Sequence, residues 1–320
     1  MTGSPINLSP RRPHILAERL PDLIEPYLEE ARLRVSPTTA ASYDYLLSLL
    51  LEWWESAGPA LGFVLDERAW RLYEGWLLRR PSSQSGKPMT WGSRNKALGV
   101  CRQLLAWAHR CGYLDRDFSS QVPRASGAPT RRDAPELEDL RRLMAAAGES
   151  RKPVRDQALV AVFVGTGIRR AEAAALAVDD VSFHADGAGS LFVRKGKMGK
   201  PRTVVFDALC GGYLARLIDE LGRTSGPLFS NWNGGNLSPK SVYSVVKTAM
   251  QRAGVDSRGA GPHDLRRAFA TAWLRSRRSL GDGQLLSMQL GHSTEAMSVH
   301  YSRPTLDDLQ DGFASPLGLL

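Results

Sequence analysis

The sequence predicts a mainly helical protein of two domains, in which only the second domain contains strands. Apolar residues recur at helical spacing in four segments before residue 115, with no strand pattern between them. Residues 115–135 mix proline, serine, glycine and charge without periodicity, which marks a linker. Three short strand-like runs occur only after it. We therefore expect an all-helical N-terminal domain, then an α+β domain with a small three-stranded antiparallel sheet.

The first domain is predicted over residues 16–114, after a flexible arm at residues 1–15. Its second helix shows the pattern most clearly, because apolar side chains recur at the i, i+3, i+4, i+7 spacing from Tyr43 to Trp53. Ser36-Pro37 before this helix and Gly58-Pro59 after it are typical boundary residues. The predicted helices cover residues 16–34, 37–57, 67–78 and 90–110.

The second domain is predicted over residues 136–304, followed by a tail at residues 305–320. Strands are expected at residues 180–184, 190–194 and 203–206. Helices are expected at residues 135–146, 154–165, from about 169, and at 208–221, 239–253, 263–275, 284–290 and 295–301. The tail has an apolar stripe, which we expect to pack on its own domain or on a neighbouring subunit.

Composition narrows the class of protein. The net charge is +9 over 320 residues, and residues 141–320 carry about +8 of it, which favours a polyanionic partner such as nucleic acid or an anionic membrane. The three cysteines form no CxxC pair, so neither a disulfide framework nor a zinc knuckle is expected, and a reducing cytoplasm fits best. The longest apolar run, residues 158–165, is too short to span a membrane.

Familiar nucleotide and metal motifs are missing from the sequence. It contains no GxxxxGK[ST] loop, no HExxH and no HxE…CxxC pattern. No arrangement of carboxylates for two-metal chemistry is visible either. We therefore expect no cofactor and no metal.

Cationic residues stand at the edges of the predicted elements. Gly165-Thr166-Gly167 leads through Ile168 to Arg169 at a helix start, where a guanidinium can grip a phosphate through two hydrogen bonds. Glu172, three residues on, is within pairing distance of Arg169, so a surface ion pair is the alternative. Residues 194–202 place five cations between two predicted strands, which is either a hairpin that enters a DNA groove or a solvated turn.

The remaining motifs contain histidine, arginine and tyrosine. His263 and Arg266 share one helix face after Pro262, and histidine exchanges protons near neutral pH. Leu290-Gly291-His292-Ser293 follows, and Tyr301 lies nine residues after His292. A tyrosine can act as a nucleophile when a base or cations lower its pKa from about 10. Each of these residues alone is more often structural.

In this order, the motifs TGIRRAE, the basic GK hairpin, HDLR, LGHS and the final tyrosine resemble the tyrosine recombinase (phage integrase) family. The resemblance covers residues 18–305. The first half is similar to the family's helical core-binding (SAM-like) domain, and residues 136–304 to its catalytic domain. The layout resembles the simple two-domain Xer-like or Cre-like members.

The resemblance implies a role for each motif residue. Arg169 and Arg266 would clamp the scissile phosphate, and His292 would hydrogen-bond to it. Tyr301 would attack phosphorus and form a 3′-phosphotyrosyl bond, with His263 as its proton acceptor or as its partner in the reverse step.

The leaving 5′-oxygen would receive its proton from Lys197, with Lys195 and Lys200 as alternatives. Glu172 would be structural. No metal or nucleotide is implied, because the covalent bond retains the energy of the broken phosphodiester.

The implied partner is double-stranded DNA. Predicted contacts come from the hairpin cations Lys195, Lys200 and Arg202, and from the fourth helix with Arg94, Lys96 and Arg102. The resemblance also implies a tetramer on two paired sites, with the tail docked in a neighbour, and leaves room for an accessory recombination protein. Two alternative functions stay open: a type IB topoisomerase, and a DNA-binding architectural factor without catalysis.

Overall fold

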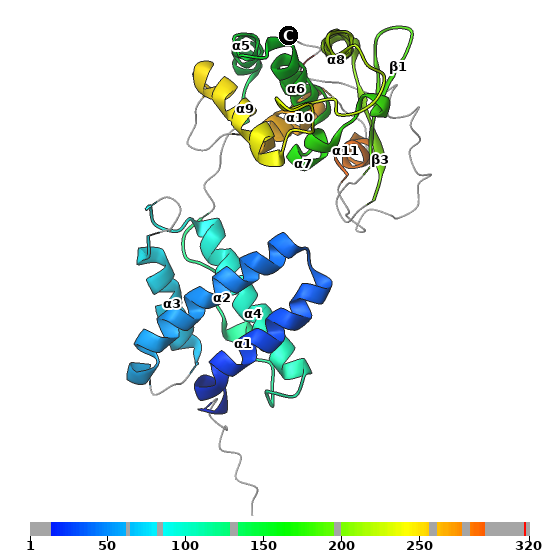
Figure 1. Ribbon diagram of the computed structural model, residues 1–320. Coiled ribbons are helices and arrows are strands. Elements are labelled where there is room, and N and C mark those ends of the chain that lie inside the picture. Colours follow the sequence, from blue (N-terminus) through cyan, green and yellow to red (C-terminus); the bar gives the residue numbers. More distant parts are fainter. Residues whose placement is uncertain are drawn as a thin grey trace, which may run out of the picture. The chain divides into compact units, whose positions relative to one another are not determined.

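The computed structural model describes residues 14–61, 65–81, 86–128, 134–194, 200–255, 261–276, 282–291 and residue 317. The chain divides into two compact units, Met1–Arg131 and Arg132–Leu320. Figure 1 shows helices in the first unit and helices with a small sheet in the second. The predicted fold class, mainly helical with a three-stranded antiparallel sheet, is confirmed.

Four α-helices make up most of the described part of the first unit. They are α1 (His14–Arg34), α2 (Pro37–Ala57), α3 (Glu67–Arg79) and α4 (Trp91–Arg110). Two short 3₁₀ helices, η1 (Pro59–Leu61) and η2 (Ser119–Gln121), add to them and were not predicted. The predicted helix boundaries agree with the structure to within two residues.

Side-chain caps explain why these helices start where they do. The Ser36 hydroxyl accepts the N–H of Thr39 at 3.3 Å, and Pro37 occupies the first turn of α2. The Asp66 carboxylate accepts the N–H of Ala69 at 2.8 Å at the start of α3. Each cap satisfies a backbone donor that the helix itself leaves without a partner.

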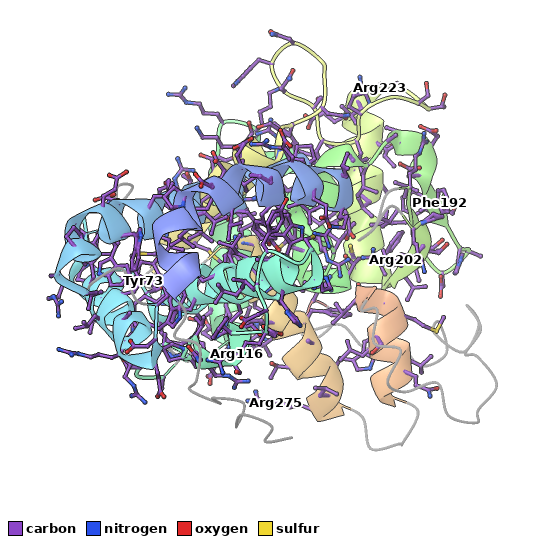
Figure 2. The ribbon with its side chains drawn as sticks, turned by 90° about the horizontal axis from the view of Figure 1, so that it is seen from below. Tyr73, Arg116, Phe192, Arg202, Arg223 and Arg275 are labelled. Carbon is purple, nitrogen blue, oxygen red and sulfur yellow. The ribbon has the colours of Figure 1, made fainter. Side chains whose placement is uncertain are left out.

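The core of the first unit is rich in aromatic side chains. Trp70 and Tyr73 are fully buried on α3, and Trp53 of α2 lies 5.1 Å from the Tyr73 ring. Tyr73 lies within its helical unit, whereas Arg116 lies at the surface over the ring of Phe118 (Figure 2). Burial of these rings gives the unit a core of its own.

The second unit is built around α6 (Pro153–Thr166). From Ala158 to Val164 this helix is apolar on all sides, which predicts burial, and it packs against α5, α8 and α10. The other helices of the unit are α5 (Leu137–Gly148), α7 (Arg170–Ala175), α8 (Ala208–Leu221), α9 (Pro239–Arg252), α10 (Pro262–Ser276) and α11 (Asp282–Leu290), and η3 (Val178–Asp180) is a short 3₁₀ helix. The predicted helix at residues 295–301 lies outside the described residues.

The sheet has the order β1-β2-β3, with both pairs antiparallel, from β1 (Val181–Phe183), β2 (Gly189–Val193) and β3 (Arg202–Phe206). Leu191 pairs with Val204, and both face the core. Phe192 lies on the opposite face, 46% exposed (Figure 2). β3 is an edge strand, and α11 packs against it.

One residue of the tail is described. Leu317 is fully buried in the core of the second unit, and its Cδ2 would lie 3.5 Å from a Cβ placed on Gly165 of α6. The Cys210 side chain of α8 lies against the same point, with Sγ at 3.3 Å. Leu317 thus packs on its own chain, and the other residues of the predicted tail lie outside the described residues.

Candidate active site

The turn between α6 and α7 presents the first predicted site residue. Gly167 ends α6 in the left-handed conformation, with φ of 64°. The Thr166 hydroxyl donates to the carbonyl of Val162 at 2.6 Å and accepts the N–H of Ile168 at 3.2 Å. These bonds fix the turn, and Arg169 follows as the N-cap residue of α7.

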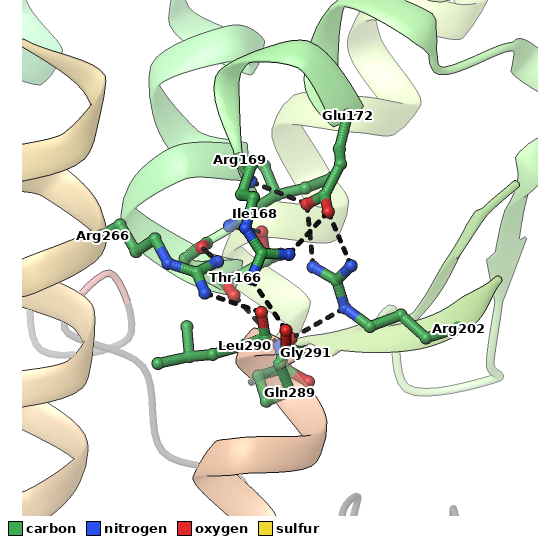
Figure 3. A network of polar contacts seen from close by, with 10 residues as sticks. Thr166, Ile168, Arg169, Glu172, Arg202, Arg266, Gln289, Leu290 and Gly291 are labelled. Atoms are coloured by element: carbon green, nitrogen blue, oxygen red, sulfur yellow. Dashed lines mark hydrogen bonds and ion pairs between the residues drawn. The ribbon is translucent and has the colours of Figure 1, made fainter. Parts of the chain in front are cut away.

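Glu172 of α7 is the anionic centre of the site (Figure 3). Its carboxylate accepts the Arg169 backbone N–H at 2.9 Å and the Arg169 Nη1 at 2.8 Å. Arg202 donates to both carboxylate oxygens, at 2.7 and 2.8 Å. The Glu172 side chain is 3% exposed, so these bonds replace its hydration almost completely.

The pKa of Glu172 reflects two opposing effects, burial and hydrogen bonding. Burial raises it, but hydrogen bonds from Arg202 and from the Arg169 backbone outweigh burial and lower the pKa to about 2. The carboxylate therefore stays charged at neutral pH. Its role is structural, because its oxygens hold two guanidinium groups in fixed positions.

Arg266 of α10 is buried, with 6% of its surface exposed. Its Nη1 donates to the Gly167 carbonyl at 2.7 Å, and its Nη2 donates to the Leu290 carbonyl at 2.6 Å. Burial, and then the charge of Arg169, lower its pKa to about 10. The guanidinium remains charged at neutral pH, next to a second cation.

The C-terminal end of α11 gathers the three arginines. Successive carbonyls at 289–291 accept hydrogen bonds from Arg202 at 3.3 Å, Arg266 at 2.6 Å and Arg169 at 2.7 Å. Carbonyls at a helix C-terminus carry partial negative charge, which favours cations there. Backbone atoms, rather than carboxylates alone, therefore bring these cations together (Figure 3).

The cluster carries more positive than negative charge. Arg169, Arg202 and Arg266 contribute three cations, and Glu172 is the carboxylate that the structure shows among them. Within the described residues this leaves an excess of about two positive charges. The Arg169 side chain is 27% exposed, so an anion can reach it from solvent. The arrangement is suited to bind an oxyanion.

The other predicted site residues divide into two groups. His263 is exposed in the first turn of α10, one turn before Arg266. Lys195, Lys197, His292 and Tyr301 lie outside the described residues. The structure thus brings together Arg169, Glu172 and Arg266, and the catalytic roles assigned to all of these residues stay predictions.

Two of the predicted DNA contacts, Arg94 and Arg202, bind partners within the chain. Arg94 is buried, where it pairs with Glu74 at 3.2 Å and donates to the carbonyls of Met89 and Ser126. Arg202 is 13% exposed and binds Glu172 with both terminal nitrogens. The buried Arg94 is therefore structural, and contact of the partly exposed Arg202 with DNA stays a prediction.

Three other predicted DNA contacts are described by the structure. Lys200 and Lys96 are exposed, and the Lys96 amine donates to the Ser42 hydroxyl at 2.7 Å. Arg102 is half-buried, and its Nη1 donates to the carbonyls of Val122 and Pro123. Their contact with DNA stays a prediction.

Sequence reasoning missed two residues of the site. Gln289 is fully buried on α11, and its only sequence signal is a polar residue in the apolar run before Gly291. Asp264 accepts the Gly261 N–H at 2.9 Å and so fixes the first turn of α10 beside His263. An acidic residue in a first helical turn was its signal.

Within the described ranges, no group of histidine, cysteine, aspartate or glutamate residues is arranged to hold a metal ion. Over the same part of the chain, no helix has both the length and the apolar character needed to cross a membrane.

Comparison with known proteins identifies the family. Residues 136–306 match the phage integrase family. The chain is 30% identical over 286 residues to the tyrosine recombinase XerD of Corynebacterium glutamicum, covering 87% of this chain and 91% of the relative. It is 28% identical to XerD of Vibrio cholerae, covering 90% and 93%.

Solved structures agree in fold. A lambda integrase dimer bound to a COC′ core site superimposes with a TM-score of 0.65 at 15% identity, covering 90% of this chain and 99% of that one. XerH bound to a palindromic difH substrate gives a TM-score of 0.62 at 19% identity, covering 85% and 77%. The chain belongs to the phage integrase family. Within that family, it is a tyrosine-type site-specific recombinase.

Proposed function

We propose that this recombinase cleaves and rejoins duplex DNA through a 3′-phosphotyrosyl intermediate, with Tyr301 as the nucleophile. The observation that carries the proposal is the arginine cluster, in which Arg169 and Arg266 lie close together with an excess of positive charge. A phosphodiester supplies the missing negative charge. The family membership of the chain supports the same substrate.

The two arginines fit the electrostatic demand of phosphoryl transfer. When an oxygen nucleophile attacks phosphorus, negative charge builds on the non-bridging oxygens. Cations that are already in place stabilise that charge without further reorganisation. Arg266 is held by two backbone carbonyls, and Arg169 by Glu172 and the Gly291 carbonyl. Both guanidinium groups are therefore oriented before the substrate arrives.

The proposed reaction balances without an external energy source. The Tyr301 oxygen forms a bond to phosphorus, and the bond from phosphorus to the 5′-oxygen breaks. His263 accepts the tyrosine proton, and Lys197 donates a proton to the 5′-oxygen, with Lys195 and Lys200 as alternatives. His292 hydrogen-bonds to the phosphate. A 5′-hydroxyl from a second strand then reverses these steps and releases the tyrosine.

The proposed assembly is a tetramer on two paired DNA sites. A lambda integrase tetramer bound to a Holliday junction superimposes on this chain with a TM-score of 0.63, which supports a fold compatible with such an assembly. We place the reaction in the cytoplasm, which agrees with free cysteines at Cys101, Cys111 and Cys210. An accessory protein that gates one active site against another would fit the same scheme.

Covalent capture tests the nucleophile and the DNA site together. Wild type, Tyr301→Phe and the control Tyr113→Phe, an exposed tyrosine of the first unit, are mixed with nicked DNA fragments. The fragments cover the flanks of the gene and the replication terminus of its host. SDS stops the reaction, and protein-linked DNA is recovered and sequenced. We expect wild type and Tyr113→Phe to be linked at one recurring sequence, and Tyr301→Phe to form no link.

Each other outcome contradicts part of the proposal. Linkage without sequence preference indicates a type IB topoisomerase activity. DNA binding without linkage, in all three proteins, indicates a binding protein without catalysis. Linkage by Tyr301→Phe equal to wild type means that another residue is the nucleophile.

A further inference from the structure

Gln289 of α11 makes an unusual set of contacts for a side chain in a catalytic unit. Its Oε1 accepts the Val205 backbone N–H at 3.1 Å, and its Nε2 donates to the Val205 carbonyl at 2.9 Å. The same Nε2 donates to the Thr166 carbonyl at 3.3 Å. The side chain is fully buried, so these bonds replace all of its hydration.

These contacts close the edge of the sheet. β3 is an edge strand, and Val205 turns both its N–H and its carbonyl toward the Gln289 amide. An unpaired strand edge that is buried leaves polar groups unsatisfied. The glutamine amide occupies the position of a further strand for one residue. It thereby fixes α11 against β3 in one register.

The third contact joins α11 to α6. Gln289 binds the Thr166 carbonyl at the end of α6, and Arg266 binds the next carbonyl, that of Gly167. Arg266 also binds the Leu290 carbonyl at the end of α11. The C-terminal ends of both helices are therefore tied together at one place. That place holds the two arginines proposed to bind phosphate (Figure 3).

The position of α11 controls both arginines directly. Arg169 donates to the Gly291 carbonyl, two residues beyond Gln289, and Arg266 donates to the Leu290 carbonyl, one residue beyond it. A shift of this helix end would move the acceptors of both guanidinium groups. His292 is the next residue of the chain.

We propose that Gln289 is a positioning residue for strand cleavage. Its amide fixes the end of α11 to β3 and α6, and so sets Arg169 and Arg266 at the distance that the scissile phosphate requires. This inference rests on the proposed function of the two arginines. Gln289 itself does not touch the substrate.

Gln289→Met tests this role, because methionine keeps the length and apolar volume of the side chain but donates and accepts none of the three bonds. The matched control is Gln251→Met, the same change at an exposed position of α9. We expect Gln289→Met to slow formation of the covalent protein–DNA linkage about 10- to 100-fold, as small displacements of catalytic groups do. DNA affinity should change less than about threefold, because most contacts with phosphates lie elsewhere. Gln251→Met should match wild type.

A neutral substrate separates positioning from general damage. In a methylphosphonate linkage, one non-bridging oxygen is replaced by methyl, so the linkage has no charge for the arginines to neutralise. If Gln289 acts through Arg169 and Arg266, the defect of Gln289→Met relative to wild type shrinks to less than about threefold on this substrate. An equal defect on both substrates would overturn the inference.

Two further results are decisive. A folded Gln289→Met that cleaves the phosphate substrate like wild type rejects the positioning role and leaves the proposed function intact. Absence of linkage by wild type on the phosphate substrate rejects the proposed function itself. If Gln289→Met does not fold, as judged by its melting temperature, Gln289→Glu is used. This variant keeps the shape and one acceptor but loses both donor bonds. Its defect on the phosphate substrate is compared with its defect on the methylphosphonate substrate in the same way.

Discussion

Glu172 shows how a single buried charge organises the site. Its carboxylate lies between the guanidinium groups of Arg169 and Arg202 and holds both through charge-assisted hydrogen bonds. Removing one partner of a buried pair leaves the other charge without compensation. The effect of Glu172 on the active site is therefore indirect, through the arginine that it orients.

The low pKa of Glu172 predicts a specific dependence of stability on pH. The ordinary pKa of 4.5 falls to about 2 in the folded chain, so the carboxylate contributes about 3 kcal/mol of stability above pH 4.5. That contribution is lost as the pH falls from 4.5 toward 2. We expect Glu172→Gln to destabilise the second unit at pH 7 by about 3–5 kcal/mol and to lose less stability on acidification. Hydrogen exchange of α6 amides at pH 7 and pH 3 measures this.

Glu67→Gln is the control for this measurement, because Glu67 forms an exposed ion pair with Arg71 in the first unit. It should leave α6 exchange unchanged at both pH values. Equal exchange in Glu172→Gln and wild type at pH 7 would contradict the role of Glu172.

Pairing between side chains could be predicted where its signal is local. Arg169 and Glu172 are three positions apart, so the sequence indicates that they pair. The partners of Arg94 and Arg202 lie 20 and 30 residues away, at Glu74 and Glu172. Nothing in the sequence indicates that these distant carboxylates pair with the two arginines, and both arginines were therefore taken for surface cations.

At the scale of elements, the ends of helices carry the site. Gly167 ends α6 with φ of 64°, and Gly222 ends α8 with φ of 59°. A Cβ on Gly167 would lie 2.7 Å from Phe269 and 2.8 Å from Leu290, whereas a Cβ on Gly222 would meet nothing within 4 Å. The two positions share the same backbone conformation and differ in their surroundings.

Alanine at these two glycines separates backbone strain from packing. Gly222→Ala should destabilise the chain by about 1–2 kcal/mol, the cost of the left-handed conformation alone. Gly167→Ala adds overpacking against α10 and α11, so we expect about 2–5 kcal/mol in total and slower covalent linkage. Urea unfolding and covalent capture measure the two effects. Equal losses of stability in both variants would show that the packing at Gly167 relaxes freely.

The helices could be predicted from the sequence because their signals are local. Apolar spacing and caps such as Ser36 and Ser238 act within four residues and set most boundaries. The joining of α6, β3 and α11 could not be predicted. It depends on Gln289, whose partners Thr166 and Val205 are 123 and 84 residues distant.

At the scale of the whole molecule, Leu317 packs into the core of the second unit. Leu317 and Cys210 lie against the same point of α6, at Gly165. Burial raises the pKa of the Cys210 thiol well above its ordinary value, which disfavours the reactive thiolate. The proposed docking of tails between subunits would require this contact to open.

The reactivity of Cys210 therefore tests whether Leu317 occupies its place in the core. In a Cys111→Ser background, which removes the exposed thiol, we expect Leu317→Ala to raise the rate of Cys210 modification by a thiol reagent. The variant should also lose about 2–5 kcal/mol of stability. Leu274→Ala, at a side chain that is 56% exposed, is the control and should leave the rate unchanged. An unchanged rate in Leu317→Ala would mean that Leu317 does not cover Cys210.

The buried charge of Arg266 has a consequence for the lifetime of the protein. Folding lowers the pKa of Arg266 to about 10. Keeping its guanidinium charged at neutral pH therefore costs the folded chain about 3 kcal/mol of free energy relative to the unfolded chain. An anion at the site offsets that cost, and a ligand that binds only the folded state stabilises it. Proteases in a cell degrade unfolded chains, so marginal differences in stability change abundance. Copies that have bound DNA are therefore expected to outlast copies that have not.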